Sequence, residues 1–436
     1  MIETVQRHTR SLFPPIGLMC LTCAFSAIAL EYLPMPYVFV AGLCALVASI
    51  AAIYSVRPWA KAFYFNAAIV MIGLAGAEVY FYEMYFADEP PREVEYRLMG
   101  ESASPNSIIE SFDYHEKLGY AYRKQPGFTQ TTRFKGQLLY EVSYTLDEHG
   151  LRISPPFNRV STTKPSCVVF FGDSFTFGEG VKDDETLPYR TGLKTQNRYQ
   201  VYNFGFLGYG PHQMLAQLQH ELVHQAIRCS PRYAIYQALP SHVSRAAGLE
   251  LWDQAGPQYI LNKEGKIEAQ AHFNDHPKPG AHAALRRLHQ TLPYHVRRCF
   301  EKSAVYRGIL YMRRTIETRD IALFAGLVDE THRFLVERYP GIEFHILFWD
   351  FSHQTDATEI ETIEALKKTK IPLHLISSVV PDYAQQRDRY ILHPADGHPN
   401  KVTYDLIADY LIGKIIKPTT ALMPLEVVQD NRRGFP

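Results

Sequence analysis

Residues 167–178 read Cys-Val-Val-Phe-Phe-Gly-Asp-Ser-Phe-Thr-Phe-Gly, and this stretch decides how the larger part of the chain is interpreted. Its first five residues form a short apolar run, which is typical of a strand buried on both faces of a parallel sheet. The glycine after the run permits a sharp turn, so the Ser174 hydroxyl is expected above the sheet edge, near backbone N–H groups that could bind an oxyanion. Gly-Asp-Ser alone is a weak signal, and its placement after the strand makes Ser174 a candidate nucleophile. The chain contains no Gly-x-Ser-x-Gly, which argues against the α/β-hydrolase fold.

The sequence after residue 167 alternates between short apolar runs and segments of helical periodicity. This alternation predicts an α/β protein, an open α/β/α sandwich with a central parallel sheet and right-handed crossovers. Active sites in such sheets lie beyond the carboxyl ends of the strands. Residues 240–318 interrupt the pattern, and their Gly, Pro and His content predicts an insertion that forms a lid or a substrate wall. The further strands are expected at 200–204, 233–239, 344–349 and 372–376, and the helices at 213–227, 321–338, 360–368 and 402–415.

Two other segments carry possible chemistry. Residues 202–210 read Tyr-Asn-Phe-Gly-Phe-Leu-Gly-Tyr-Gly after the second strand, and residues 395–400 read Ala-Asp-Gly-His-Pro-Asn before the last helix. Together with the Gly-Asp-Ser segment, they resemble the motif blocks of the SGNH (GDSL-type) hydrolases. The resemblance covers roughly residues 165–415 and implies a serine esterase or acyltransferase that uses no cofactor.

The resemblance also implies catalytic roles. Ser174 would be the nucleophile, His398 the general base and Asp396 the residue that orients the base. This is chemically reasonable, because a serine hydroxyl is a poor nucleophile until a base accepts its proton, and a carboxylate stabilises the resulting imidazolium. Many family members space the pair as Asp-x-x-His, whereas this chain has the Asp-Gly-His-Pro-Asn form. His393 also precedes a proline and is the competing base.

The sequence accounts for the oxyanion hole less completely than for the three proposed catalytic residues. By resemblance, the backbone N–H groups of Ser174 and Gly208 belong to it, although from the residues alone Gly208 could simply form a turn before the next helix. The third strand runs into residues 237–242 without the Asn that family members usually carry there, and by position His242 or Ser241 could donate instead. Loss of one oxyanion donor typically costs about 3–4 kcal/mol in the barrier. A substituted donor, a specialised acyl-transfer enzyme and a degenerate binding domain therefore all stay open.

The N-terminal region contains three apolar segments, at 12–30, 37–54 and 63–82. They lack Lys, Arg and Asp, contain Glu78 as their only formal charge, and are long enough to cross the ~30 Å hydrocarbon core of a bilayer. We therefore expect residues 1–84 to be an anchor of three transmembrane helices in contact with membrane lipid. Buried core helices or a cleaved signal peptide are the alternatives.

The cations near these segments predict an orientation. Arg7 and Arg10 precede the first segment, and Arg57 and Lys61 lie between the second and third, whereas the loop at 31–36 carries no cation. The positive-inside rule then places the N-terminus in the cytoplasm and everything after about residue 83 outside it. The chain is thus expected in the inner (cytoplasmic) membrane with a periplasmic catalytic domain.

Three further regions complete the expected organisation. Residues 85–164 are predicted to be an extracytoplasmic linker, with an alternating stretch at 138–146 that favours a strand pair. Residues 165–418 would be the hydrolase-like domain, and residues 419–436 a C-terminal tail.

Composition narrows the possible partners. Lys plus Arg and Asp plus Glu each number 45, so no basic field points to nucleic acid. No metal-binding motif is evident. Cys20, Cys23 and Cys44 fall in the apolar segments and Cys167 in the first strand, which leaves Cys229 and Cys299 as a pair that could be bridged outside the cytoplasm.

Three functions are compatible with these features. The first is an esterase that removes acyl or acetyl groups from cell-surface carbohydrate or lipid. The second is an O-acyltransferase that modifies an envelope polysaccharide, and this version would need a membrane partner. The third is an inactive SGNH domain that binds glycan. The substrate class rests on analogy alone.

Overall fold

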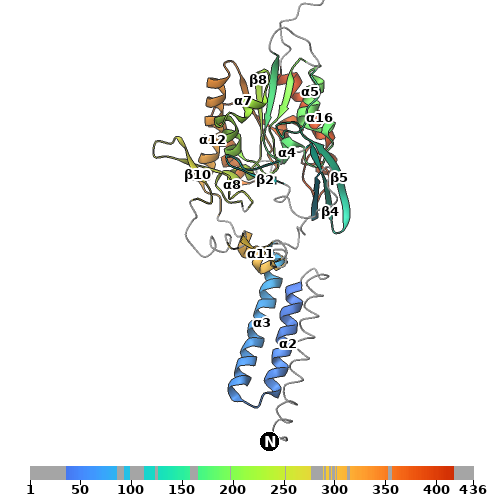
Figure 1. The fold of residues 1–436 in the computed structure, drawn as a ribbon, viewed down its shortest axis with the longest axis vertical. Helices are drawn as coiled ribbons and strands as arrows, with labels where there is room; N and C mark the ends of the chain where they lie inside the picture. Colours follow the sequence, from blue (N-terminus) through green and yellow to red (C-terminus); the bar gives the residue numbers. More distant parts are fainter. Residues whose placement is uncertain are drawn as a thin grey trace, which may run out of the picture. The chain divides into compact units, whose positions relative to one another are not determined.

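The computed structural model describes residues 36–85, 93–98, 112–122, 126–157, 165–196, 198–250, 252–275, a few residues between 288 and 300, and then 302–311, 315–351 and 356–416. The chain forms two compact units. The first comprises residues 1–93, 134–136 and 275–315, and the second comprises residues 94–133, 137–274 and 316–436 (Figure 1).

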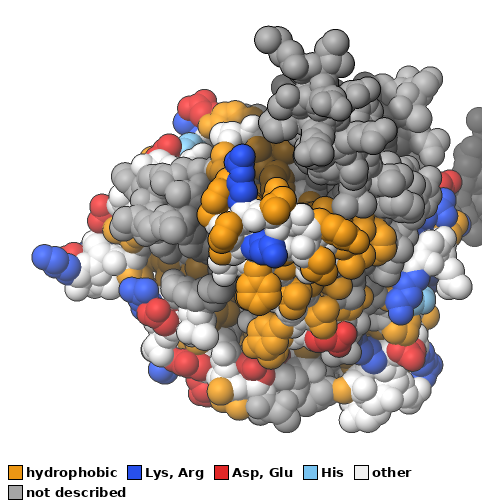
Figure 2. Space-filling view, turned by 90° about the horizontal axis from the view of Figure 1, so that it is seen from below, with side chains coloured by type: hydrophobic (Ala, Val, Ile, Leu, Met, Phe, Trp, Pro, Cys, Tyr) orange, Lys and Arg blue, Asp and Glu red, His pale blue; other side chains and the backbone are white. Residues whose placement is uncertain are grey.

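Two long apolar helices dominate the first unit. Helix α2 (Pro36–Tyr54) has 19 residues and α3 (Pro58–Tyr85) has 28, which is about 42 Å at 1.5 Å per residue. Within the described residues, these two helices are long and apolar enough to cross a membrane. Figure 2 views the end where α2 and α3 are joined and shows hydrophobic side chains gathered at the centre of that face, with Lys and Arg among them. Large apolar side chains are exposed along both helices, including Leu46, Ile53, Trp59, Phe63 and Val70.

These helices match two of the three predicted spans, at 37–54 and 63–82. The third helix begins five residues earlier than predicted, because Pro58 suits the first turn of a helix, where its missing N–H costs nothing. The predicted span at 12–30 lies outside the described residues.

The one carboxylate predicted inside a span is paired within this unit. Glu78 of α3 is buried, and its carboxylate accepts hydrogen bonds from the Ser303 hydroxyl and from the Ala304 N–H at 2.6 Å. Ala304 begins helix α11 (Ala304–Tyr311), so Glu78 neutralises the positive end of that helix. The pairing explains how an apolar helix tolerates a carboxylate.

The second unit is built on a five-stranded parallel sheet with the order β12-β11-β8-β6-β7, which confirms the predicted α/β class. The strand that precedes Ser174, β6, lies between β7 and β8. Its residues alternate between two cores, because Cys167, Val169 and Phe171 face one side of the sheet and Val168 and Phe170 face the other. The strands are β6 (Ser166–Phe171), β7 (Gln200–Asn203), β8 (Ser230–Ala238), β11 (Glu343–Phe348) and β12 (Leu373–Leu375).

Helices cover both faces of this sheet, as Figure 1 shows with α7 and α12 on one side and α5 and α16 on the other. One layer contains α6 (Pro211–Gln219), α7 (Leu222–Ala226), α12 (Thr318–Arg338) and α13 (Ala357–Lys368). The other contains α5 (Leu187–Lys194), preceded by the short helix η1 (Asp183–Glu185), and then α14 (Ile376–Val379), α15 (Arg387–Tyr390), α16 (Lys401–Tyr410) and η2 (Leu411–Ile415).

One helix prediction is wrong in its continuity. The single helix expected at 213–227 is two helices, α6 and α7, because Glu221 between them adopts a left-handed conformation with φ +61°. The apolar periodicity runs through the break, and for this reason the sequence pattern does not reveal it.

Part of the segment predicted to be a linker packs into the second unit. Strands β1 (Glu93–Leu98), β4 (Gly127–Phe134) and β5 (Gln137–Thr145) form a sheet, and β2 (Phe112–His115) pairs with β3 (Gly119–Tyr122). The stretch at 138–146, where a strand pair was predicted, is the single strand β5, and its partner is β4. Phe128 and Tyr144 share a core with Phe177 and Phe206, so these strands support the loops that follow β6 and β7.

The predicted insertion at 240–318 is divided between the two units. Its first part forms α8 (Ser241–Ala246) and a hairpin of β9 (Pro257–Leu261) and β10 (Ile267–His272) in the second unit. Residues 275–315 belong to the first unit.

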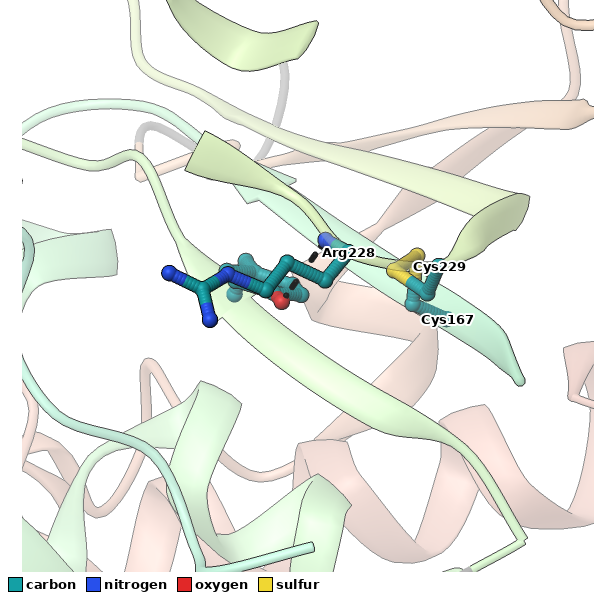
Figure 3. The surroundings of a disulfide bond; sticks show 4 residues. Cys167, Arg228 and Cys229 are labelled. Carbon is teal, nitrogen blue, oxygen red and sulfur yellow. Dashed lines mark hydrogen bonds between the residues drawn. A yellow bond between two sulfur atoms is a disulfide. The ribbon is translucent and has the colours of Figure 1, made fainter. Parts of the chain in front are cut away.

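A disulfide joins Cys167 and Cys229, whose Cα atoms are 5.8 Å apart (Figure 3). The Cys229–Cys299 bridge, which the sequence left open, is therefore not formed. The sheet register explains the pairing, because Ser166 of β6 is paired with Ser230 of β8, and this brings the residue before β8 next to Cys167. The adjacent Arg228 N–H donates to the Tyr202 hydroxyl at 3.1 Å.

Candidate active site

Ser174 lies directly beyond the carboxyl end of β6, at the first residue of the short helix α4 (Ser174–Phe177). Asp173 is the N-cap, and its side chain accepts from the Phe175 N–H at 3.0 Å. This cap fixes the turn, because the first N–H groups of a helix have no partner within the helix. Ser174 is only 7% exposed, so it is largely shielded from solvent.

The Ser174 hydroxyl meets the imidazole of His398. Ser174 Oγ lies 2.9 Å from His398 Nε2, and His398 Nδ1 is hydrogen-bonded to Asp396 Oδ1. The His398 backbone N–H also donates to Asp396 Oδ1 at 3.2 Å. The structure thus brings together the three residues expected to form the triad, with the carboxylate and the hydroxyl on opposite nitrogens of the ring.

The loop that carries His398 is held by backbone contacts. The Leu392 N–H donates to the His398 carbonyl at 2.9 Å, and Asn400 caps α16 by accepting from the Thr403 N–H at 3.2 Å. His393, the competing base, accepts a hydrogen bond on Nδ1 from the Ala395 N–H at 3.0 Å. His393 therefore contributes to the turn before Asp396, whereas His398 is the histidine in contact with Ser174.

The glycine-rich segment after β7 lies against the Ser174 loop. The Phe206 N–H donates to the Gly172 carbonyl at 3.2 Å. Gly205 is needed for this approach, because a Cβ there would lie 2.5 Å from Thr176 Cβ and 2.7 Å from the Phe177 nitrogen. A larger residue at position 205 would push the two loops apart.

Gly208, the expected oxyanion donor, has φ +76° and faces aromatic side chains. A Cβ at this position would lie 2.7 Å from the Tyr120 hydroxyl oxygen and 2.9 Å from Trp252 Nε1. No residue in the described part of the chain accepts a hydrogen bond from the Gly208 N–H. An N–H in this condition is available to a ligand oxygen.

His242, expected as a substitute oxyanion donor, has a different position. It is completely buried, its Nδ1 is 2.6 Å from the Tyr236 hydroxyl oxygen and its Nε2 is 3.2 Å from Asp173 Oδ2. Since both ring nitrogens face protein groups, His242 does not donate to a substrate, and that expectation is corrected. Ser241, the other candidate, is exposed at the first residue of α8.

Asp173 is the centre of a largely buried charged cluster that supports the Ser174 loop. Arg245 Nη1 donates to Asp173 Oδ2 at 2.7 Å and to the Tyr209 carbonyl at 2.7 Å, so it ties the two motif loops together. Burial alone would raise the pKa of the Asp173 carboxyl, but Arg245 and His242 hold that pKa well below its usual range. Burial lowers the pKa of His242 to about 4, although the Asp173 charge acts in the opposite direction.

Sequence reasoning missed several residues that shape this loop. Gln237, at the end of β8, donates to Thr176 Oγ1 at 2.9 Å. Arg152 is fully buried and donates to the carbonyls of Phe177 and Val181, at 2.9 and 2.6 Å. A single Arg or Gln in a sequence carries no local signal of such a role, because the role depends on partners from distant elements.

A second carboxylate also reaches the triad. Glu179 Oε2 lies 3.3 Å from His398 Nε2, and Glu179 Oε1 accepts from Gln130 Nε2 at 2.7 Å. Glu179 was not predicted as a site residue. For metals, no group of three or more His, Cys, Asp or Glu side chains in the described ranges is arranged to hold an ion.

Comparison with known proteins gives distant structural similarity only. No protein-family model and no curated protein sequence matches the chain. A lipolytic protein of the G-D-S-L family from Desulfitobacterium hafniense matches with 12% identity and a TM-score of 0.31 over 56% of this chain and 95% of its own. An acetyl xylan esterase from Butyrivibrio proteoclasticus matches with 12% identity and a TM-score of 0.29, over 60% of this chain and 66% of its own.

A two-domain esterase active on acetylated mannans matches with 13% identity and a TM-score of 0.31, over 57% of this chain. The chain spans about half (48%) of the length of that esterase. At this level of similarity, the function of the chain is inferred from its own residues.

Proposed function

We propose that the chain is a membrane-anchored, extracytoplasmic serine esterase that acts on acyl or acetyl esters of cell-surface carbohydrate or lipid. The observation that carries this proposal is the contact of Ser174 Oγ with His398 Nε2 at 2.9 Å, with Asp396 bound to the other ring nitrogen. A hydroxyl, a base and a carboxylate in this order form an activated nucleophile.

The proposed reaction proceeds through an acyl-enzyme. Ser174 Oγ attacks the ester carbonyl while His398 Nε2 accepts the hydroxyl proton, and the backbone N–H groups of Ser174 and Gly208 bind the developing oxyanion. The tetrahedral intermediate collapses, the C–O bond to the alcohol breaks, and His398 returns the proton to the leaving alcohol. Water then attacks the acyl-enzyme, again with His398 as base, and releases the acid and free Ser174.

The geometry supports a catalytic domain more than one that only binds glycan. Ser174 and His398 are 7% and 9% exposed, and Asp396 is 1% exposed. Holding a carboxylate and an imidazole out of water costs free energy, and a binding surface would not require this arrangement.

A fluorophosphonate probe tests the activated serine. Membranes that carry wild type should be labelled, membranes with Ser174→Ala should not, and Ser230→Ala, a change of an exposed serine, should be labelled like wild type. Failure to label well-folded wild type would favour the glycan-binding alternative. For a labelled enzyme, release of free acid identifies an esterase, whereas transfer to an added polysaccharide identifies an O-acyltransferase.

The location outside the cytoplasm is supported by two features. Arg57 lies between α2 and α3 and Lys61 lies near the start of α3, and the positive-inside rule places such cations in the cytoplasm. The Cys167–Cys229 disulfide is typical of proteins that fold in an oxidising compartment.

Fusions to a reporter enzyme that is active only outside the cytoplasm test this topology. A fusion after residue 85 should be active, and a matched fusion after residue 56, between α2 and α3, should be inactive. The reverse pattern would overturn the proposed orientation.

A further inference from the structure

The base of the candidate triad has carboxylates near both ring nitrogens. Asp396 binds Nδ1, and Glu179 Oε2 lies 3.3 Å from Nε2, the same atom that is 2.9 Å from Ser174 Oγ. In a triad with one carboxylate, Nε2 faces only the nucleophile. Here the nitrogen that must accept and return a proton faces two oxygens.

Glu179 is fixed in this position by residues from β4 and β5. Its Oε1 accepts from Gln130 Nε2 at 2.7 Å, and Gln130 Oε1 accepts from the Tyr144 hydroxyl at 2.8 Å. The Tyr144 oxygen in turn accepts from the Gly180 N–H at 2.9 Å. Gln130 and Tyr144 are fully buried, and Glu179 is 9% exposed. A carboxylate held by such a network cannot simply turn away into solvent.

The other groups around His398 do not replace Glu179. Tyr140, whose hydroxyl also accepts from Gln130 Nε2 at 3.2 Å, has a pKa raised far above its ordinary value by burial and by the charges of Glu179 and Asp396, so it stays neutral. Phe175 places an apolar ring 5.2 Å from the imidazole, centroid to centroid. The carboxylates of Asp396 and Glu179 both lie within ion-pair distance of the ring, and the Arg387 guanidinium lies beside Gly397, between Asp396 and His398 in the chain.

The charge of Glu179 acts on the protonated imidazole. A neutral ring presents a lone pair at Nε2, which a carboxylate oxygen at 3.3 Å repels, whereas a protonated ring presents an N–H that the carboxylate attracts. When Ser174 attacks, its proton moves to Nε2 and a positive ring is formed between two negative groups. The same attraction holds the proton more tightly in the resting enzyme, so a higher pH is required before Nε2 can accept it.

We propose that Glu179, held by Gln130, is a second carboxylate of the base, that it stabilises the imidazolium formed during attack and leaving-group departure, and that it shifts activity toward alkaline pH. This inference rests on the proposed esterase function. The proton balance is unchanged, since the proton that leaves Ser174 Oγ is carried on Nε2 and departs with the leaving alcohol.

The sharpest variant is Glu179→Gln. Because Gln130 donates to the Oε1 position, the amide oxygen of the new side chain should occupy that position and the amide nitrogen should replace Oε2 opposite Nε2. The acidic limb of the kcat/KM profile should then move to lower pH by about one unit. The rate on the alkaline plateau should fall about tenfold, because the imidazolium has lost a stabilising charge.

Companion variants separate this role from a structural one. Glu179→Asp keeps the charge and should restore the wild-type position of the acidic limb in part. Gln130→Leu leaves the carboxylate less fixed and should shift the limb in the same direction as Glu179→Gln, by less. Glu330→Gln, which changes a partly exposed glutamate paired with Arg333 on α12, should leave the profile unchanged.

An NMR titration of the full chain in detergent, with 15N-labelled histidine, gives a readout that does not require turnover. The ring signals of His398, identified by their absence in His398→Ala, should titrate at lower pH in Glu179→Gln than in wild type. An unchanged titration would overturn the inference even if no ester were hydrolysed. Absence of fluorophosphonate labelling at Ser174 in wild type, by contrast, would overturn the proposed function. The histidine titration would then still test the effect of Glu179 on His398.

Discussion

Two buried histidine–aspartate pairs flank Ser174, and only one of them has the geometry of a catalytic base. His398 is 9% exposed and directs Nε2 at Ser174 Oγ, with Asp396 on Nδ1. His242 is completely buried, with Nδ1 on the Tyr236 hydroxyl and Nε2 toward Asp173. Proximity of a histidine to an aspartate therefore does not identify a base, and the group opposite the carboxylate decides the role.

Asp173 and Asp396 likewise differ in the group that each of them contacts. Asp173 has Arg245 Nη1 at 2.7 Å as its main charge partner, whereas Asp396 orients a histidine that reaches the nucleophile. In the Asp173 pair, His242 is neutral at neutral pH because burial lowers its pKa to about 4, so the ion pair of Asp173 with Arg245 carries the charge. We infer that the Asp173 cluster is a structural support of the Ser174 loop, and the following variants test the distinction.

The largest expected effect comes from the proposed catalytic pair, His398 and Asp396. His398→Ala should reduce kcat/KM for an activated ester by about 10⁴-fold, because Ser174 loses the base that accepts its proton. The melting temperature should change little by comparison. Ester hydrolysis and fluorophosphonate labelling measure the loss, and residual activity within tenfold of wild type would remove His398 from the proposed mechanism.

Breaking the supporting pair should act on stability. Asp173→Asn should lower the free energy of unfolding by about 3–5 kcal/mol, because the largely buried Arg245 would lose its counter-charge. Urea unfolding monitored by circular dichroism measures the change. The double variant Asp173→Asn with Arg245→Met should recover part of the loss, and strictly additive losses would argue against the ion pair as the cause.

These two pairs also show what the sequence could predict. The apolar run 167–171 and the alternation that follows contain the information for a parallel sheet, and the motif resemblance was enough to select Ser174, Asp396 and His398. The same sequence suggested His242 as an oxyanion donor. That suggestion failed because the position of a residue after a strand does not determine the direction of its side chain. Only the fold shows that the ring is buried, with Nδ1 hydrogen-bonded to the Tyr236 hydroxyl and Nε2 3.2 Å from Asp173 Oδ2.

Other features depend on contacts between distant segments. The Cys167–Cys229 bridge follows from the register of β6 against β8, which the cysteine spacing does not contain. Glu179 is only five residues from Ser174, yet its role depends on Gln130, which lies in a region predicted to be a linker. A carboxylate near a motif becomes informative only when the residue that orients it is known.

The pKa of His242 predicts a pH dependence of stability. Its value is about 4 in the folded protein against an ordinary value of 6.5, so the unfolded chain binds a proton more readily. The free energy of unfolding therefore contains a contribution from neutral His242 that is fully present above pH 6.5 and is lost as the pH falls toward 4. At 1.4 kcal/mol per pKa unit, this contribution is roughly 3 kcal/mol. Urea unfolding between pH 7 and pH 4 should show this loss, and His242→Asn should show a flatter profile from a lower starting stability. An equally steep profile in that variant would assign the acid sensitivity to other groups.

The smallest effect separates His398 from its neighbour in the same loop. His393→Ala removes the acceptor of the Ala395 N–H, a contact worth about 1 kcal/mol, and should keep kcat/KM within about threefold of wild type. His393 and His398 both precede a proline and lie close to Asp396. We nevertheless expect a large loss of activity only for His398→Ala, because only His398 contacts Ser174. A loss comparable to that of His398→Ala, in a variant with normal unfolding behaviour, would mean that the imidazole in contact with Ser174 is not the base. Retained activity would show that contact of Nε2 with the Ser174 hydroxyl, more than a nearby carboxylate, distinguishes the proposed base from His393.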